Sequence, residues 1–164
     1  MSRAEELIAL AERVEALDGR NNGGDMTIAT GDIARVLGWV RVPPSESRSR
    51  KGHWIAPEDC RDGVPVYDSL HGTDCWRSPP NWLWSLDAAM TLVPDNWVIA
   101  SLEWWPQRDR AGVTLREVKD FEADGGFGFG FDESCGNARS HHRTPALALT
   151  AAALRARAAQ DARP

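Results

Sequence analysis

Eight tryptophans in a chain of 164 residues constrain this fold more than any other feature of the sequence. Each indole carries a large apolar area and one N–H that seeks a partner, so it suits both core packing and stacking on a flat ligand. We expect most of them in the core or at its margin, and about two or three facing a pocket. They are Trp39, Trp54, Trp76, Trp82, Trp84, Trp97, Trp104 and Trp105.

Composition is typical of a soluble globular protein of one domain. Hydrophobic residues make up 42% and charged residues 26% of the chain, which has the length to bury roughly two thirds of its unfolded surface. Its apolar runs are far shorter than the roughly 18 residues that span a bilayer, and its acidic, amphipathic N-terminus lacks the pattern of a secretory signal. We therefore expect a cytoplasmic protein that does not bind membranes.

Charge and cysteine content narrow the partners. A net charge of −5 argues against general nucleic-acid binding, because attachment to a phosphate backbone needs a basic face. It leaves room for a local basic pocket that takes a small anion. The cysteines lack the density of a disulfide framework, which agrees with a reducing compartment. They are Cys60, Cys75 and Cys135.

Capping signals and apolar periodicity predict two helices in the first part of the chain. A capping box at Ser2 begins the first, an amphipathic helix over residues 1–18. A flexible connector at 21–24 follows. Thr30 caps the second, short helix, and Gly38 ends it in a left-handed conformation.

Two more helices are predicted further on. Ser85 caps the third, and Pro94 ends it. Its inward stripe is predicted to contain Leu86, Ala89, Met90 and Val93. Thr144 caps the fourth and Pro145 occupies its first position, where the missing N–H leaves nothing unsatisfied. Small alanines line one side of this last helix and allow close packing on a sheet or on a neighbouring helix.

Period-two alternation predicts strands between the third and fourth helices. Trp97–Trp105 alternates, with one face predicted to contain Val98, Ala100, Leu102 and Trp104 and the other Ser101 and Glu103. Val113–Phe121 and Phe127–Phe131 flank the turn Asp124-Gly125-Gly126, which is typical of a hairpin. Earlier in the chain, residues 43–80 are interrupted by Pro, Gly and charge, and only His53–Ile55 looks like a strand.

These elements predict an α+β fold, an antiparallel sheet with helices packed on both faces and one long irregular insertion. The whole chain, residues 1–164, is predicted to be a single domain. Residues 1–18 form its N-terminal helix, and residues 43–80 form the insertion.

Two segments carry a family resemblance. WSLDAAMTLVPDNW at 84–97 and RTPALALTAAALRARA at 143–158 resemble the phage ABA sandwich domain family. Gly38-Trp39 and the segment 51–54 are also similar, so the resemblance spans about residues 30–160, with 84–160 as its best-matching core. It departs at Asp95-Asn96 and over residues 58–80. The resemblance implies a small phage or prophage protein with helices on both sides of an antiparallel sheet, and it supplies no catalytic residues.

The sequence contains possible metal ligands but does not predict a metal site. Cys60, His71 and Cys75 are the best group of ligands, with Asp74 or His53 as a fourth, because thiolate and imidazole are the ligands that Zn²⁺ prefers. Their spacing matches no standard zinc ribbon. We therefore interpret them as ordinary loop residues and expect no metal and no cofactor.

Catalysis is also not predicted. Nucleophilic catalysis would need a Cys or Ser, a nearby base and an orienting group, and the pairing worth naming is Cys135 with His141 or His142. Adjacent histidines before a capped helix cannot both aim at one centre. We interpret all three as exposed loop residues and expect no enzyme.

Aromatic and basic residues occur together in two places, and these are the predicted binding sites. Such groups stack on a base and bind phosphate, and they also form protein-binding hot spots. The predicted ligand-binding residues are Trp104, Trp105, Arg108 and Arg110 in one segment, and Trp54, Arg48, Arg50 and Lys51 in the other.

From these features we expect a non-catalytic phage accessory protein that acts in the host cytoplasm by binding a host component. It would either sequester a nucleotide-derived immune signal as an anti-defence factor or block a host protein. A virion or structural protein without a small-molecule ligand is the alternative, and a small enzyme acting on nucleotides is a distant one. Homo-oligomer formation stays open.

Overall fold

Two compact units make up the chain: residues 1–26 with 81–164, and residues 27–80. The computed structural model describes residues 1–18, 23–46, 52–61, 64–65, 78–123, 126–130 and 136–163, with backbone only for 64–65, 119–123 and 126–130. In these ranges no helix is both long and apolar enough to cross a bilayer. The prediction of one domain stays a prediction.

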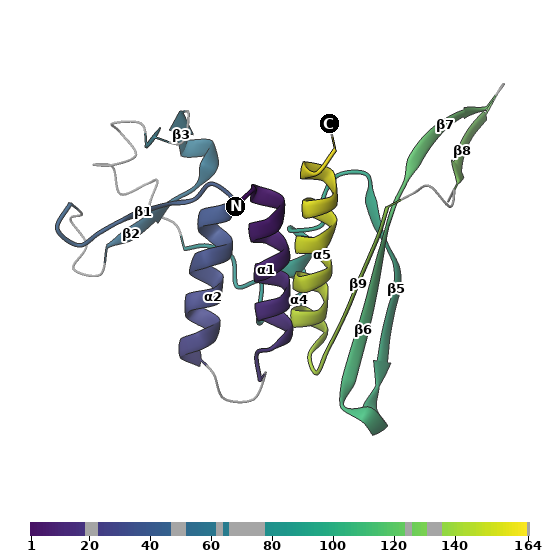
Figure 1. Ribbon diagram of the computed structural model, residues 1–164, viewed down its shortest axis with the longest axis horizontal. Helices are drawn as coiled ribbons and strands as arrows, with labels where there is room; N and C mark the ends of the chain where they lie inside the picture. Colours follow the sequence, from purple (N-terminus) through teal and green to yellow (C-terminus); the bar gives the residue numbers. More distant parts are fainter. Residues whose placement is uncertain are drawn as a thin grey trace. The chain divides into compact units, whose positions relative to one another are not determined.

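The first unit combines helices with an antiparallel sheet (Figure 1). Its three-stranded sheet has the order β5-β6-β9, and β7 and β8 form a separate antiparallel pair. The helices are α1 (Arg3–Glu15), α4 (Leu86–Met90) and α5 (Pro145–Asp161), and the strands are β5 (Trp97–Trp105), β6 (Arg110–Glu117), β7 (Lys119–Ala123), β8 (Gly126–Gly130) and β9 (Asn137–His142).

Helix α5 is the centre of this unit. It packs against β6 and β9 on one side and against α1 and α4 on the other, so that it lies between α1 and the sheet (Figure 1). Every residue from Ala146 to Leu154 is buried, and Leu147 and Leu154 are 0% exposed. The sequence predicted a single buried stripe. Alanine on the remaining sides lets α1 and α4 pack closely against α5, because a methyl group adds little width.

The sheet turns one face toward α5, and we call this the helix face. Alternate residues of β6 are buried there: Ala111, Val113, Leu115 and Glu117. The predicted α+β class with an antiparallel sheet is confirmed. One detail differs. Among the described residues of this unit the helices contact the helix face, whereas the sequence predicted helices on both faces. The opposite face, which we call the open face, carries a pocket.

A β-bulge at Ala100 changes the predicted faces of β5. Ile99 pairs with Leu115 and Ser101 pairs with Thr114, so Ala100 is an extra residue without a partner. Directly paired residues of neighbouring strands have side chains on the same face. Val98, which pairs with Arg116, therefore lies on the open face, whereas Leu102 and Trp104 lie on the helix face. Strict alternation had placed these three side chains together.

Three of the four predicted helix starts are confirmed. Ser2 forms the capping box of α1, the Ser85 hydroxyl accepts from the Ala88 N–H at 3.2 Å, and the Thr144 hydroxyl accepts from the Leu147 N–H at 3.4 Å. The third helix is shorter than predicted, since α4 ends at Met90. Its predicted inward stripe is wrong in part: Ala89 is buried, but Leu86 and Met90 are 38% and 45% exposed.

The predicted hairpin is confirmed as the pairing of β7 with β8, in which Asp120 lies opposite Phe129. Its first strand differs, because β6 and β7 are separate strands and Val113 belongs to β6, which pairs with β5 and β9. Asp124, Gly125 and Phe131 lie outside the described residues. Strand β9 is missing from the prediction altogether, because its residues were interpreted as a loop.

Charged side chains join the layers of the first unit. Arg155 on α5 binds the Glu15 carboxylate of α1 through two hydrogen bonds of 2.5 and 2.7 Å, and Ser140 on β9 donates to the same carboxylate at 2.6 Å. Arg163 forms an ion pair with the buried Glu117. The arginines near the end of α5 thus have specific partners, in addition to the favourable interaction of cations with the helix dipole at that end.

The second unit contains helix α2 (Gly23–Val36, beginning in the first unit), the antiparallel pair β1 (Val40–Val42) and β2 (His53–Ile55), the 3-10 helix η1 (Pro57–Asp59), and the short pair β3 (Cys60–Arg61) and β4 (Val64–Pro65). The predicted strand at 53–55 and the left-handed Gly38, with φ of 91°, are confirmed. The helix begins at Gly23 and not at Thr30, because the buried residues Met26, Ala29, Thr30 and Ile33 form a helical stripe.

Candidate functional site

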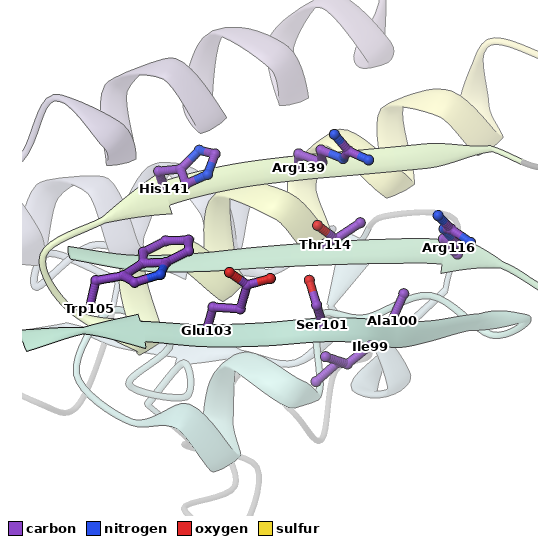
Figure 2. Close-up of a pocket in the computed structure, with 9 residues that line it drawn as sticks. All are labelled: Ile99, Ala100, Ser101, Glu103, Trp105, Thr114, Arg116, Arg139 and His141. Carbon is purple, nitrogen blue, oxygen red and sulfur yellow. The ribbon is translucent and has the colours of Figure 1, made fainter.

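The open face of the three-stranded sheet holds a pocket of about 560 Å³ (Figure 2). Strand pairing sets its side chains in cross-strand rows. One row contains Ser101, Thr114 and Arg139, and the next contains Glu103, Gly112 and His141. Arg116 lies beyond the first row, and Trp105 lies beyond the second. The pocket thus has an aromatic end and an end with two arginines, with hydroxyl groups between them.

Trp105 and His141 form the aromatic end, which we call the aromatic platform. Their ring centroids are 6.2 Å apart and their planes differ by 27°, an offset arrangement that aromatic rings favour. Both rings lie over Gly112 on the middle strand. A Cβ atom there would come within 2.9 Å of the Trp105 six-membered ring and 3.1 Å of His141 Cδ2. Glycine is therefore what allows the rings to rest on the backbone.

The turn from β5 to β6 positions Trp105. The 3-10 helix η2 (Pro106–Arg108) follows it, and Asp109 closes the turn in the left-handed conformation, with φ of 46° and ψ of 49°. This turn returns the chain so that Arg110 pairs with Trp105 and lies on the same face. The indole and the guanidinium group of this turn consequently border the same end of the sheet.

A second pocket of about 450 Å³ lies at that end of the sheet. Its lining comes from the end of α1, from the β5–β6 turn and from the end of β9. His141 lines this pocket as well as the first. Arg143 in its wall lies 3.3 Å from Asp18 and 3.8 Å from Asp109, and all three side chains are about half exposed. Its lining also contains Glu15, Arg108, Arg110 and His142.

The structure separates the residues of the first predicted site. Trp105 lines the first pocket, and Arg108 and Arg110 line the second. Trp104 lies on the helix face and is 47% exposed, because consecutive residues of a strand point in opposite directions.

The second predicted site lies in the second unit. There the half-buried Trp54 ring packs over Gly31, and the Arg41 guanidinium carbon lies 5.4 Å from the ring centroid. Arg41 was not predicted. Arg48, Arg50 and Lys51 lie outside the described residues.

The expected place in the core or at its margin is confirmed for most of the described tryptophans, whereas Trp105 is the one that lines either of the two pockets and two or three had been expected there. Trp82 and Trp97 are buried, 2% and 5% exposed, and the Trp82 N–H donates to Thr91 at 3.2 Å. Trp39, Trp54 and Trp105 are half-buried, whereas Trp84 is 50% exposed. Trp76 lies outside the described residues.

Sequence reasoning missed the residues of the pocket that come from β6 and β9, namely Thr114, Arg116, Arg139 and His141. A signal was present. Asn137–His142 alternates small or buried side chains with large polar ones, and its buried members are Ala138, Ser140 and His142. The absence of any large aliphatic residue hid this alternation.

The histidines of β9 have separate roles. His142 points to the helix face, where it is 6% exposed. Its Nδ1 accepts from the Thr144 N–H at 3.2 Å, so its Nε2 carries the proton and donates to the Leu17 carbonyl at 2.6 Å. The interpretation of His141 and His142 as exposed loop residues is therefore wrong for the buried His142, and both belong to a strand. Cys135 lies outside the described residues.

Of the possible metal ligands in the sequence, His53 and Cys60 lie in the described ranges. Cys60 is half-buried, its thiol donates to the Ala56 carbonyl at 3.5 Å, and burial raises the pKa of that thiol. His71, Asp74 and Cys75 fall outside the described residues. In the part of the chain that the structure describes, no three His, Cys, Asp or Glu side chains cluster as metal ligands would.

Comparisons with protein-family models, with curated proteins and with solved structures give no match to this chain. The resemblance to the phage ABA sandwich domain family therefore stays a prediction. Inference about function rests on the geometry of the two pockets.

Proposed function

We propose that the open face of the β5-β6-β9 sheet binds a small planar anion of the nucleotide class and holds it without converting it. The observation that carries this proposal is the aromatic platform of Trp105 and His141 over Gly112, in one pocket with Arg116 and Arg139. Any of the nucleobases can stack on such a platform, because every base has a π face.

The polar groups of the pocket supply the rest of the recognition. Arginines form charge-assisted, often bidentate hydrogen bonds with phosphate, roughly twice as strong as neutral ones. The pocket has two arginines and one carboxylate, Glu103, so it favours an anion overall. Glu103 lies in the row of Gly112 and His141, beside the platform, where its oxygens accept from N–H groups of a base or from sugar hydroxyls.

The histidines support binding over catalysis. His141 packs against Trp105, and His142 is engaged at both ring nitrogens on the helix face. A general base needs to reach the proton that it removes. We propose on this ground that the protein is not an enzyme and that the ligand leaves chemically intact.

The setting of this activity rests on the sequence alone. The resemblance to a phage family and the acidic composition support an accessory protein that sequesters a nucleotide-derived signal in the host cytoplasm. Blocking of a host protein is the second candidate. The exposed side chains of Trp84, Leu102 and Trp104, at 50%, 41% and 47%, favour it, since large apolar residues are common anchors of protein interfaces.

Isothermal titration calorimetry with AMP, GMP, CMP and UMP tests the proposal. We expect binding to the wild-type protein and a loss of at least tenfold in affinity for Arg139→Ala, because one of the two phosphate-binding cations of the pocket is removed. Arg3→Ala is the matched control, since Arg3 is a half-exposed arginine of the same unit in an ion pair with Asp161 at 3.4 Å, on the first turn of α1.

Heat denaturation of the complex, followed by chromatography of the supernatant, then tests whether the ligand is intact. The proposal fails if none of the four nucleotides binds, or if Arg3→Ala weakens binding as much as Arg139→Ala. A new product in the supernatant would return the enzyme alternative to first place. Binding of a host protein in the absence of any nucleotide affinity would favour the second candidate.

A further inference from the structure

The two pockets of the first unit share a wall. His141 lines both, and Arg110, which lines the second pocket, pairs across the strands with Trp105, which lines the first. One ring of the aromatic platform, that of His141, therefore borders both pockets. A ligand that stacks on this ring has the polar lining of the first pocket on one side and that of the second pocket on the other.

The volumes of the two pockets distinguish a mononucleotide from a larger ligand. A single small-molecule site usually has about 300–1,000 Å³. The first pocket of about 560 Å³ already falls in this range, and the second adds about 450 Å³. A mononucleotide on the platform with its phosphate toward Arg116 and Arg139 would leave the second pocket empty.

The arginines of the second pocket are groups that can bind a second phosphate. Arg108, Arg110 and Arg143 come from the turn and from the end of β9. Three acidic residues, Glu15, Asp18 and Asp109, share the lining. Two of these acids are tied to Arg143 at 3.3 and 3.8 Å through side chains about half exposed to water, and exposed pairs of this kind contribute little. Glu15 is held by Arg155 and Ser140. Replacement of one of these carboxylates by a phosphate at Arg143 therefore costs little free energy.

We infer that the ligand is a dinucleotide, with one nucleotide in each pocket and the platform of Trp105 and His141 between them. This inference rests on the proposed function and adds to it the length of the ligand. The first nucleotide stacks on the platform and reaches Arg116 and Arg139, and the second lies against Arg108 and Arg143. Such a ligand gains affinity from both pockets. Because its two halves are covalently linked, the entropy cost of immobilising the ligand is incurred only for one molecule.

Paired titrations test the inference. Affinities are measured by calorimetry for AMP against the 5′-phosphorylated dinucleotide pApA, and for GMP against pGpG. We expect the better dinucleotide to bind the wild-type protein at least tenfold more tightly than its mononucleotide. Arg143→Ala and Arg108→Ala should each reduce this ratio below tenfold and leave the mononucleotide affinity within about twofold of wild type. Arg139→Ala should weaken both ligands by similar factors.

Two variants of the second pocket are tested, Arg143→Ala and Arg108→Ala, so that the inference can still be checked if one of them fails to fold. Circular dichroism and a melting curve establish whether each variant is folded. Arg3→Ala again serves as the control and should keep the full ratio. If mononucleotides bind and the wild-type ratio is below tenfold, or if neither Arg143→Ala nor Arg108→Ala reduces it, the dinucleotide inference is wrong and the proposed function stands. If none of these four ligands binds, the dinucleotide inference is wrong, and the proposed function is wrong as well if CMP and UMP also fail to bind.

Discussion

Gly112 lies beneath both rings of the aromatic platform, and a larger residue there would compete with them for the same space. We predict that Gly112→Ala displaces Trp105, because the new Cβ would lie 2.9 Å from its ring, closer than carbon atoms approach. The displaced ring should show a shifted indole emission maximum. Nucleotide affinity should fall at least tenfold, measured by the same calorimetry.

Gly24→Ala is the matched control for this substitution. Gly24 lies in α2, and a Cβ there would meet no heavy atom within 4 Å. Alanine in a helix is favoured over glycine by about 1 kcal/mol, so this variant should be as stable as the wild type or slightly more stable. Unchanged indole emission and unchanged nucleotide affinity in Gly112→Ala would show that the positions of the Trp105 and His141 rings do not require a glycine at residue 112.

Glu15 gives a prediction about pH. The hydrogen bonds from Arg155 lower the pKa of the Glu15 carboxyl below its ordinary value of 4.5. A carboxyl whose pKa is lower in the folded state stabilises the protein above the unfolded-state pKa and loses that contribution as pH falls. Glu15→Gln should therefore lower the free energy of unfolding at pH 7 by about 1–3 kcal/mol.

The difference between Glu15→Gln and the wild type should shrink as pH is lowered below 4.5. Urea unfolding at pH 7, 5 and 3 measures it. Glu6→Gln on the same helix is the control and should change stability by less than about 0.5 kcal/mol. A difference that stays constant over this range would mean that the carboxylate charge does not contribute through Arg155.

At the scale of elements, α5 holds the first unit together through its buried leucines. Leu147 and Leu154 are 0% exposed. Replacing either by Ala should lower the free energy of unfolding by about 2–5 kcal/mol, because it leaves a cavity between α5 and its neighbours. Leu86→Ala on α4 is the control and should have a much smaller effect, since Leu86 is 38% exposed. Equal effects at all three positions would contradict the central position of α5.

The bulge of β5 gives a second prediction for an element. Deletion of Ala100 removes the unpaired residue and leaves every pair of β5 with β6 in its present register. The variant should fold, with its melting temperature lowered modestly, but the altered curvature should weaken nucleotide binding because Ala100 lines the pocket. Deletion of Val113 should instead prevent folding, since β6 pairs on both sides and would slip against β5 and β9. Circular dichroism distinguishes the two.

The elements that sequence reasoning predicted well are those defined by local chemistry. Ser2, Ser85 and Thr144 cap their helices through their own side chains, so each start could be read from a few neighbouring residues. The bulge at Ala100 and the strand β9 could not be read in this way. Both depend on pairing with β6, and neither leaves a strong apolar pattern in its own segment.

For the whole molecule we predict that the full chain purifies without stoichiometric zinc. The Cys60 thiol donates to a carbonyl and its pKa is raised by burial, whereas zinc binds the thiolate. The double variant Cys60→Ser, Cys75→Ser should melt within about 2 °C of the wild type, because a structural metal site would contribute far more to folding. Elemental analysis near one zinc per chain would contradict this.

The candidate site shows why binding residues are harder to predict than elements. Sequence reasoning grouped residues that are neighbours along the chain, such as Trp104 with Trp105, and the strand separated them onto two faces. The pocket instead groups Ser101, Thr114 and Arg139, which are neighbours through register alone. Trp105 was predicted because a tryptophan beside arginines is unusual in itself, whereas a single Arg or Thr in a polar segment is not.

The central place of α5 also fixes when this protein can fold in the cell. During synthesis α1 leaves the ribosome about 140 residues before Arg155, its partner on α5. At roughly 5–20 residues per second, this leaves α1 without that partner for on the order of ten seconds. The sheet is also complete before the helix that covers it. The apolar surfaces of both are therefore exposed to solvent until α5 emerges, and in this interval the nascent chain is accessible to chaperones and prone to aggregation.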